Sequence, residues 1–310
     1  EQRAALPDAE RAKCFSRFRK LTAHVAASSE KLARTQADAG TKKNGAGKRT
    51  LPGATAPTST TPIDGAALLD EVFDLFGRFV VFPSLEAKVA ITLWCGHSHS
   101  MESFESTPRL ALLSPEPASG KTRAIEVTET LVPRPVEAIN VTPAYLFRKV
   151  ADPDGTPTIL FDEIDTLFGP RAKDHEEVRG VLNAGHRRGA VAGRCVVRGK
   201  IIETEELPAY CAVALAGLGN LPETILQRAI VIRMRRRAPT EVVEPFRRRL
   251  HAPLGNALRD RLAAWAVQVR DKLQMIPVMP DGLADRDADK WEALLSVADA
   301  AGGDWPNVAR

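Results

Sequence analysis

The sequence predicts an α/β fold in which helices cover both faces of a parallel sheet. Short apolar runs alternate with helix-like runs between residues 109 and 234, which is the order typical of parallel strands joined by helices. Residues 190–207 interrupt this order and predict an inserted β-hairpin. After about residue 238 the pattern is helical only, which predicts a small helical domain after the sheet.

Each element is expected from the spacing of its apolar residues. The expected strands are residues 109–113, 135–141, 157–162, 211–217 and 229–234. The helices expected between them lie near 121–131, 142–151, 174–186 and 222–227. Two helices are expected before the first strand, at Leu68 to Phe76 and at Leu85 to Cys95, and three after the last, at 241–250, 253–274 and 287–301.

Composition separates the 310 residues into four parts. Residues 1–36 are expected to be helical, and residues 37–62 are rich in Gly, Lys, Thr, Ser and Pro, as in a flexible linker. The sheet-forming core is expected at 63–238 and a helical lid domain at 239–310. No apolar run reaches the length of a membrane span, no signal peptide opens the chain, and the four cysteines lack metal-like spacing, so we expect a cytoplasmic protein without a membrane partner.

The segment between the first expected strand and its helix reads Ser-Pro-Glu-Pro-Ala-Ser-Gly-Lys-Thr, the setting of a phosphate-binding loop. Backbone N–H groups of such a loop bind phosphate oxygens, the Lys121 ammonium would reach the β- and γ-phosphates of ATP, and the Thr122 hydroxyl would bind Mg²⁺. Pro115 stands where the pattern asks for its first Gly. We expect Pro115, Ser119, Gly120, Lys121 and Thr122 to contact the nucleotide.

The strand expected at 157–162 ends in two acids, which would complete such a site. Asp162 would hold Mg²⁺, directly or through water, and Glu163 would polarise a water molecule for attack on the γ-phosphate. Taken alone, this run is equally well explained as a buried strand whose polar end begins a solvated helix. Together with the Gly-Lys-Thr loop, it predicts ATP and Mg²⁺ binding.

Several further motifs accompany the loop and the acids. The full set is Phe79 to Pro83, Leu113 to Thr122, Leu160 to Asp165, Phe168 to Arg171, Leu182 to Gly189, Val213 to Arg237 and Asp285 to Trp291. With these motifs the chain resembles the AAA+ class of P-loop ATPases and, more narrowly, the phage and actinobacterial family catalogued as domain of unknown function 3631. The resemblance covers roughly residues 65–310 and implies an ATPase core of P-loop NTPase fold.

The resemblance implies roles for three further residues. Asn220, or a neighbour such as Gly219, would touch the γ-phosphate and the attacking water. Arg228 would act as an arginine finger in the site of a neighbouring subunit, and Arg286 would sense the nucleotide from the lid. An arginine that acts in trans implies a homo-oligomer, for example a ring such as a hexamer. The plainer alternatives are a strand-end turn residue for Asn220 and surface charges for Arg228 and Arg286.

Basic residues gather in a few clusters, whereas the acids are spread. Arg187 and Arg188 form one, and Arg198 and Lys200 flank the expected hairpin turn. On a hairpin aimed into a central pore, such cations would follow the phosphate backbone of single-stranded or double-stranded DNA. The alternative for each cluster is a solvated face, and aromatic residues for base stacking are sparse at 5%.

These features predict an ATP-hydrolysing motor, a DNA helicase, translocase or replication factor of phage or mobile-element type. The first alternative is a nucleotide-controlled binding switch that hydrolyses little, which Pro115 would favour if the loop cannot wrap the phosphates. The second is a protein remodeller with little dependence on DNA.

Overall fold

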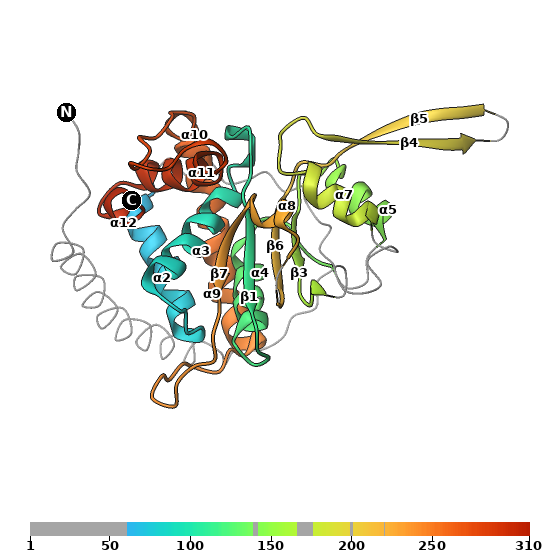
Figure 1. Ribbon diagram of the computed structural model, residues 1–310. Helices are drawn as coiled ribbons and strands as arrows, with labels where there is room; N and C mark the ends of the chain where they lie inside the picture. The colour runs from blue at the N-terminus through green and yellow to red at the C-terminus, as the bar shows by residue number, and fades with distance from the viewer. Residues whose placement is uncertain (1–60, 139–141, 166–175, 199–200, 220) are drawn as a thin grey trace, which may run out of the picture. The chain divides into compact units, whose positions relative to one another are not determined.

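The computed structural model describes residues 61–138, 142–165, 176–198, 201–219 and 221–310. Residues Ile63–Arg310 form one compact unit, whose elements are labelled in Figure 1. Among the described helices, none combines the length and the apolar character that a bilayer-spanning segment needs.

The strands are β1 (Arg109–Ser114), β2 (Pro135–Glu137), β3 (Thr158–Phe161), β4 (Val191–Arg198), β5 (Ile201–Pro208), β6 (Ala212–Leu218) and β7 (Ala229–Arg233). The helices are α2 (Gly65–Phe79), α3 (Leu85–Ser98), the 3-10 turn η1 (Met101–Ser103), α4 (Lys121–Leu131), α5 (Pro143–Val150), α7 (Glu176–Ala184), α8 (Glu223–Leu226), α9 (Arg248–Gln268), α10 (Arg270–Leu273), α11 (Asp285–Ala301) and α12 (Trp305–Val308).

Five strands form one sheet in the order β2-β3-β6-β1-β7, and every neighbouring pair is parallel. The register places Ser114 of β1 beside Leu218 of β6, and Arg109 beside Ala229 of β7. The carboxyl ends of the strands therefore meet at one edge of the sheet and the amino ends at the other. This confirms the predicted parallel sheet. The strand expected at 135–141 is observed only as Pro135–Glu137, and residues 139–141 lie outside the described residues.

Helices cover both faces of this sheet, as expected. Because side chains alternate along a strand, Leu113, Phe161 and Leu215 share one face, where they belong to a buried cluster with residues of α5, α7 and α8. On the other face α4 contacts β1 and β6, and α2 and α9 pack against α4 (Figure 1). Other helices therefore pack around α4, the helix that follows the loop between β1 and Lys121 (the Lys121 loop).

The helices after β7 pack on the helices before β1, with α11 against α3 and α9 against α2 and α4. Close approach requires small residues: a Cβ on Gly255 of α9 would lie 1.9 Å from Thr130 Oγ1 of α4. A Cβ on Gly65 would lie 2.6 Å from Trp265 Nε1. The two ends of the compact unit thus form one layer beside the sheet.

Helix boundaries after β7 differ from the prediction. The helix expected at 241–250 is absent up to its last residues, because the Glu241 carboxylate binds Arg235 and the backbone N–H of Ala238 in a non-helical turn. The break expected before 253 is also absent, since α9 continues through Pro253. A proline inside a helix costs about 3 kcal/mol, and burial of Leu258, Leu262 and Trp265 on the same helix offsets that cost.

The predicted hairpin is confirmed. Among the described residues, β4 and β5 form a two-stranded sheet of their own, in antiparallel register from Val191 beside Pro208 to Arg198 beside Ile201. Figure 1 shows them extending away from the five-stranded sheet. The base is anchored by a hydrogen bond from Ala209 N to Ala190 O of 2.9 Å, and β5 contacts α5.

Candidate functional site

The loop between β1 and α4 turns through two residues with left-handed backbone. Gly120 has φ +86° at the N-terminal cap of α4, and Ala118 has φ +59°. A side chain at position 120 would be strained, because few L-residues adopt this region. The first N–H groups of α4 have no partner within the helix, so this end of the helix can bind an anion.

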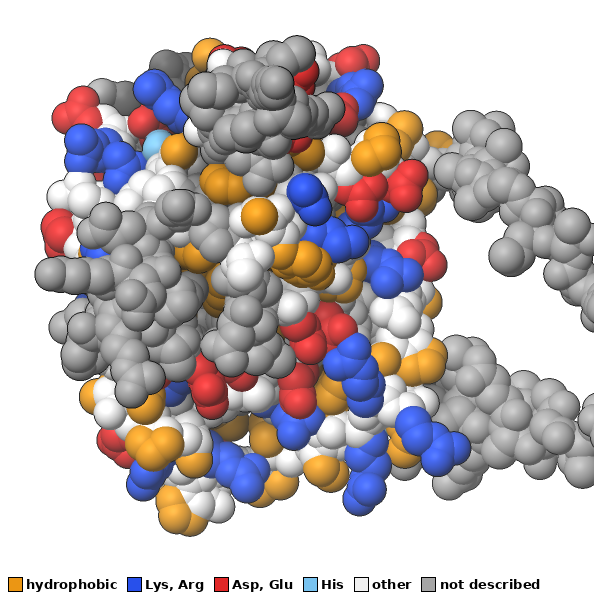
Figure 2. Space-filling view, turned by 90° about the vertical axis from the view of Figure 1, so that its right-hand side faces the viewer, with side chains coloured by type: hydrophobic (Ala, Val, Ile, Leu, Met, Phe, Trp, Pro, Cys, Tyr) orange, Lys and Arg blue, Asp and Glu red, His pale blue; other side chains and the backbone are white. Residues whose placement is uncertain are grey.

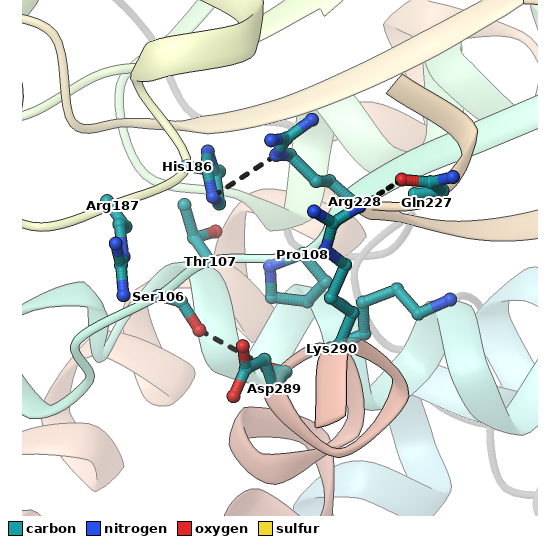
Figure 3. Close-up of a pocket in the computed structure, with 10 residues that line it drawn as sticks. Ser106, Thr107, Pro108, His186, Arg187, Gln227, Arg228, Asp289 and Lys290 are labelled. Carbon is teal, nitrogen blue, oxygen red and sulfur yellow. Dashed lines mark hydrogen bonds between the residues drawn. The ribbon is translucent and has the colours of Figure 1, made fainter. Parts of the chain in front are cut away.

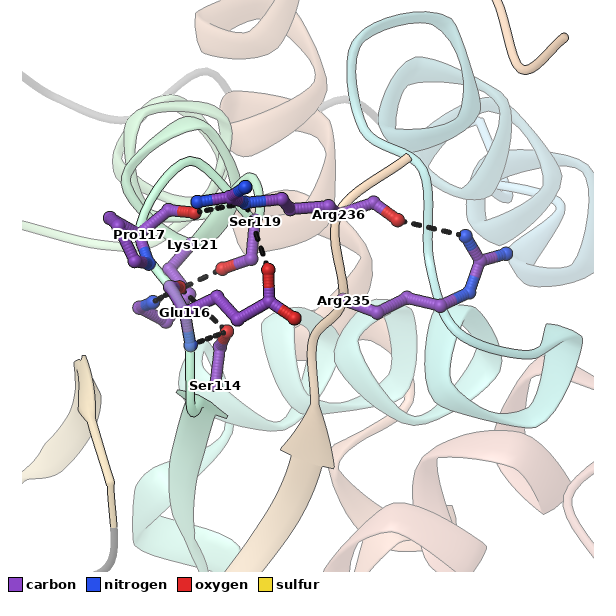
Figure 4. Close-up of polar contacts among 7 residues, drawn as sticks. All are labelled: Ser114, Glu116, Pro117, Ser119, Lys121, Arg235 and Arg236. Atoms are coloured by element: carbon purple, nitrogen blue, oxygen red, sulfur yellow. Dashed lines mark hydrogen bonds and ion pairs between the residues drawn. The ribbon is translucent and has the colours of Figure 1, made fainter. Parts of the chain in front are cut away.

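Lys121 is buried beneath this loop, with 8% of its surface exposed. Its Nζ donates hydrogen bonds to Glu116 O at 3.2 Å and to Ser119 Oγ at 3.1 Å (Figure 4). Burial lowers the pKa of Lys121, and the charges of Asp165 and Asp162 oppose that shift. The ammonium therefore lies under the loop with two carboxylates near it.

Residues 162–165, called the acidic segment below, follow β3 at the same edge of the sheet. Asp162 is half-buried, and its Oδ1 accepts a hydrogen bond of 3.0 Å from the backbone N–H of Glu163. Glu163 is exposed and has φ +59°, an uncommon conformation for a residue with a side chain. The structure thus brings Lys121, Asp162 and Glu163 to one edge, as the sequence predicts.

Asp165 was not assigned a role from the sequence. It accepts a hydrogen bond from the backbone N–H of Leu218, at the end of β6, and its charge acts on Lys121. Ile164 N also donates to Ala216 O at 2.9 Å, which fixes the acidic segment over β6. Two features of the sequence could have indicated this residue: Asp165 is a third acid shortly after Asp162 and Glu163, and a glycine stands at position 217.

The outer side of the loop is held by residues to which the sequence assigned no role in the site. Ser114 Oγ accepts from Glu116 N at 3.0 Å and donates to Glu116 O at 2.8 Å. Arg236, just after β7, donates to Pro117 O at 3.0 Å and forms an ion pair of 2.9 Å with the Glu116 carboxylate (Figure 4). Part of the basic run after β7 therefore binds the loop instead of facing only solvent.

A cavity of about 410 Å³ lies beside the loop, within the size range of small-ligand pockets. One wall is apolar, from Phe79, Val80 and Val81 after α2, and another is the backbone of Ala118, Ser119 and Gly120. Its cations are Arg123, Arg235 and Arg237. The cavity therefore places an apolar surface next to the loop before α4.

Arg228 and Arg286 lie at the opposite edge of the sheet, where they line a second cavity of about 240 Å³ (Figure 3). Arg228 immediately precedes the amino end of β7, and Arg286 donates a hydrogen bond to Gln227 Oε1. Strands rise about 3.3 Å per residue, so the six residues of β1 separate this edge from the Lys121 loop by roughly 17 Å. Within one chain, neither arginine therefore lies beside Lys121.

The remaining predicted site residues lie in different places. Arg187 lines the cavity around Arg228, and Arg188 forms an ion pair with Glu105 and donates to Glu102 O. Arg198 ends β4, whereas Lys200 and Asn220 lie outside the described residues. On the face shown in Figure 2, basic and acidic side chains are interspersed.

The C-terminal quarter of the chain is similar to known sequences. A family model described as "Protein of unknown function (DUF3631)" matches residues 233–310. An "Uncharacterized 28.9 kDa protein in xis 5'region" from Saccharopolyspora erythraea is 53% identical over 78 residues, which are 25% of this chain and 29% of that protein. The chain thus covers less than a third of that relative. The family match includes Arg286 but neither the Lys121 loop nor the acidic segment.

Proposed function

We propose that this chain is an ATP-hydrolysing motor of the AAA+ class, with a P-loop between β1 and α4. The observation that carries this proposal is the position of Lys121, buried beneath a loop with left-handed turns and near two carboxylates at the carboxyl edge of the sheet. Open α/β sheets bind their ligands at this edge. A lysine at a helix N-terminus is suited to the charge of a β,γ-phosphate pair.

The residues at this edge also suit an Mg²⁺ ion. The described residues hold no cluster of three His, Cys, Asp or Glu side chains that could bind a metal by themselves. Mg²⁺ in nucleotide sites takes only one or two protein oxygens, with phosphate and water oxygens as its other ligands. The Thr122 hydroxyl and the Asp162 carboxylate are the donors we assign, and the bound ion would neutralise charge on the phosphates.

The other residues of the site perform binding and proton transfer. Lys121 would exchange its bonds to Glu116 O and Ser119 Oγ for phosphate oxygens. Glu163 is the exposed carboxylate of the acidic segment and would orient and deprotonate the attacking water. Asn220 stays a prediction for the same water.

The 410 Å³ cavity supports a nucleoside as the other half of the ligand. A base would contact the apolar wall of Phe79, Val80 and Val81, while the phosphates reach the loop that forms the adjoining wall. Arg123 also lines this cavity, and Pro115 and Ser119 belong to the same loop.

The position of Arg228 supports an oligomer. A residue roughly 17 Å from the Lys121 loop of its own chain can stabilise a transferring phosphoryl group only in another copy. In a homo-oligomeric ring, such as a hexamer, the Lys121 loop of every copy would meet Arg228 of a neighbouring copy. Arg286, in the same cavity, would then face the same interface.

For the substrate we propose single-stranded or double-stranded DNA, as in a helicase, translocase or replication factor of phage or mobile-element type. The hairpin of β4 and β5 extends from the body (Figure 1); Arg198 is the last residue of β4, and Lys200 follows it in the sequence. Cations on such a hairpin can follow a phosphate backbone without reading sequence. Arg187 and Arg188 lie on the chain just before the hairpin.

ATP hydrolysis by the purified chain tests the catalytic part. Lys121→Ala should abolish nucleotide binding, whereas Glu163→Gln should keep binding and lower kcat by about 10²–10⁴-fold. Asp271→Asn, an exposed carboxylate on α10, is the control that should leave both unchanged. Unchanged hydrolysis in Glu163→Gln would remove the assigned base. Tight nucleotide binding by the wild-type chain with negligible turnover would favour the binding switch.

DNA dependence tests the substrate. The ATPase rate and native mass are measured with an ATP analogue, with and without a DNA strand, at several salt concentrations. Stimulation by DNA and salt-sensitive binding support the motor on DNA. Hydrolysis that ignores DNA favours the protein remodeller. If Arg198→Ala with Lys200→Ala leaves DNA affinity intact, the hairpin does not grip DNA.

A further inference from the structure

His186 lies beside Arg228 in the 240 Å³ cavity, and Figure 3 shows the two side chains joined by a hydrogen bond. The imidazole Nε2 is 3.3 Å from Arg228 Nε, and its Nδ1 is 2.7 Å from Asn183 O. A guanidinium can only donate, so Nε2 must accept. A carbonyl can only accept, so Nδ1 must carry the proton. Only one neutral tautomer of His186 satisfies both contacts.

The surroundings keep that imidazole neutral. Burial is the largest cause and lowers the pKa of His186. The Asn183 hydrogen bond opposes this shift, and the charges of Arg109, Arg228 and Arg187 each add to it. The α11 side of the cavity adds Arg286, Lys290 and the acid Asp289. The ordinary pKa of histidine is about 6.5, so His186 stays an acceptor throughout the neutral range.

The backbone around His186 is fixed as well. His186 O accepts from Thr107 N at 2.8 Å, and Cys211 N donates to Gly185 O. Arg109, which is 1% exposed, donates to Leu182 O and Cys211 O and so ties the end of α7 to the start of β6. The imidazole is therefore a rigid acceptor.

Arg228 is held at a second point, because its Nη1 donates to Thr224 O. Two of the three guanidinium nitrogens thus have fixed acceptors, one on His186 and one on α8. Two fixed acceptors define the plane of a guanidinium, which is rigid and planar. Lengthening or breaking either bond would let the group rotate.

We infer that His186 is the positioning residue of Arg228: its neutral imidazole accepts from Nε and presents the guanidinium in one orientation to a second copy of the chain. This inference rests on the proposed trans-acting role of Arg228. Protonation of His186 would replace the acceptor by a second cation, which repels Arg228. The ATPase of the assembled protein should then fall with pH as His186 gains a proton.

The test compares His186→Ala, His186→Gln, Arg228→Ala and the double variant His186→Ala/Arg228→Ala. A glutamine amide oxygen can accept from Arg228 Nε and does not titrate. We expect His186→Ala to lower kcat about tenfold with KM unchanged, and His186→Gln to stay within about twofold of wild type. The double variant should be no slower than Arg228→Ala, because both changes act through one group.

A pH profile from about 7.5 to about 5.5 supplies the second readout. Wild-type kcat should fall below that of His186→Gln at the acid end, with equal native mass and melting temperature in both. If Arg228→Ala is slow and His186→Ala is as fast as wild type, the positioning inference is wrong while the proposed function stands. If Arg228→Ala itself keeps full kcat, the trans-acting role fails. A further loss in the double variant would also overturn positioning through Arg228.

Discussion

Gly217 is where the sheet and the acidic segment approach most closely. A Cβ at this position would lie 2.4 Å from Asp165 Oδ1 and 2.6 Å from Ile164 Cγ2. The acidic segment cannot withdraw freely, because Ile164 N is bonded to Ala216 O at 2.9 Å. Gly217→Ala should therefore push the Asp165 carboxylate away from the backbone N–H of Leu218, from which it accepts a hydrogen bond.

Two terms set the size of the effect. Overpacking of a closed site costs about 1–3 kcal/mol, and loss of a hydrogen bond to a charged group costs about 1.5–3 kcal/mol. The terms overlap, since movement of Asp165 relieves the clash, so we expect a loss of about 3 kcal/mol in the free energy of unfolding. With about 2.1 cal/mol/K of unfolding entropy per residue over the compact unit, the melting temperature should drop by about 6 °C.

Thermal and denaturant unfolding measure this effect. Gly180→Ala is the matched control, because a Cβ on that helical residue of α7 meets nothing within 4 Å. It should stabilise by about 0.5–1 kcal/mol. Asp165→Ala should cost less in the Gly217→Ala background than in wild type, since the clashing carboxylate is gone. A melting temperature within about 1 °C of wild type, or fully additive losses, would refute this reasoning.

Two further predictions concern the loop and the buried histidine. Arg236→Ala should change the free energy of unfolding by less than about 1 kcal/mol, because its ion pair with Glu116 is half exposed. It should nevertheless weaken nucleotide affinity about three- to tenfold, since the outer side of the loop loses both contacts. Calorimetric titration measures this against Arg249→Ala, at an exposed position of α9, and equal affinities would contradict the prediction. Burial lowers the pKa of His97 to about 3, below the ordinary value, so the unfolded state binds more protons and stability falls as pH drops below about 6.5. Burial raises the pKa of Asp70 to about 6, which has the opposite effect on stability. The measurement is therefore the difference in the free energy of unfolding between wild type and His97→Gln. Wild type should lose about 2–3 kcal/mol more than this variant between about pH 7.5 and 4.5, and parallel pH curves would disprove the assignment.

Local patterns predicted most of the fold. The strand runs and the hairpin follow from the alternation and length of apolar segments, which act over a few residues. The predictions failed after β7, where distant partners decide the backbone. Glu241 and Glu244 are bound by Arg235 and Arg78, which keeps residues before 248 non-helical, and packing on α2 and α4 carries α9 through Pro253.

The candidate site divides in the same way. Lys121, Asp162 and Glu163 were predictable because each directly follows a strand, and the carboxyl ends of parallel strands meet at one edge. Asp165, Arg236 and His186 were not, because their partners lie 53, 119 and 42 positions away in sequence. The shared cavity of Arg228 and Arg286 likewise depends on α11 packing at the other edge of the sheet.

Pro115 is the residue at which the loop departs from its sequence pattern, and the backbone explains how it is tolerated. The left-handed turns fall at Ala118 and Gly120, so position 115 does not need the freedom of a glycine. Ala118 in that region costs about 1–2 kcal/mol, which the bonds from Lys121 to Glu116 O and Ser119 Oγ help to offset. Under the proposed function, those bonds would have to break for Lys121 to bind a phosphate. The turnover rate should therefore depend less on Pro115 than on how easily Lys121 leaves the loop.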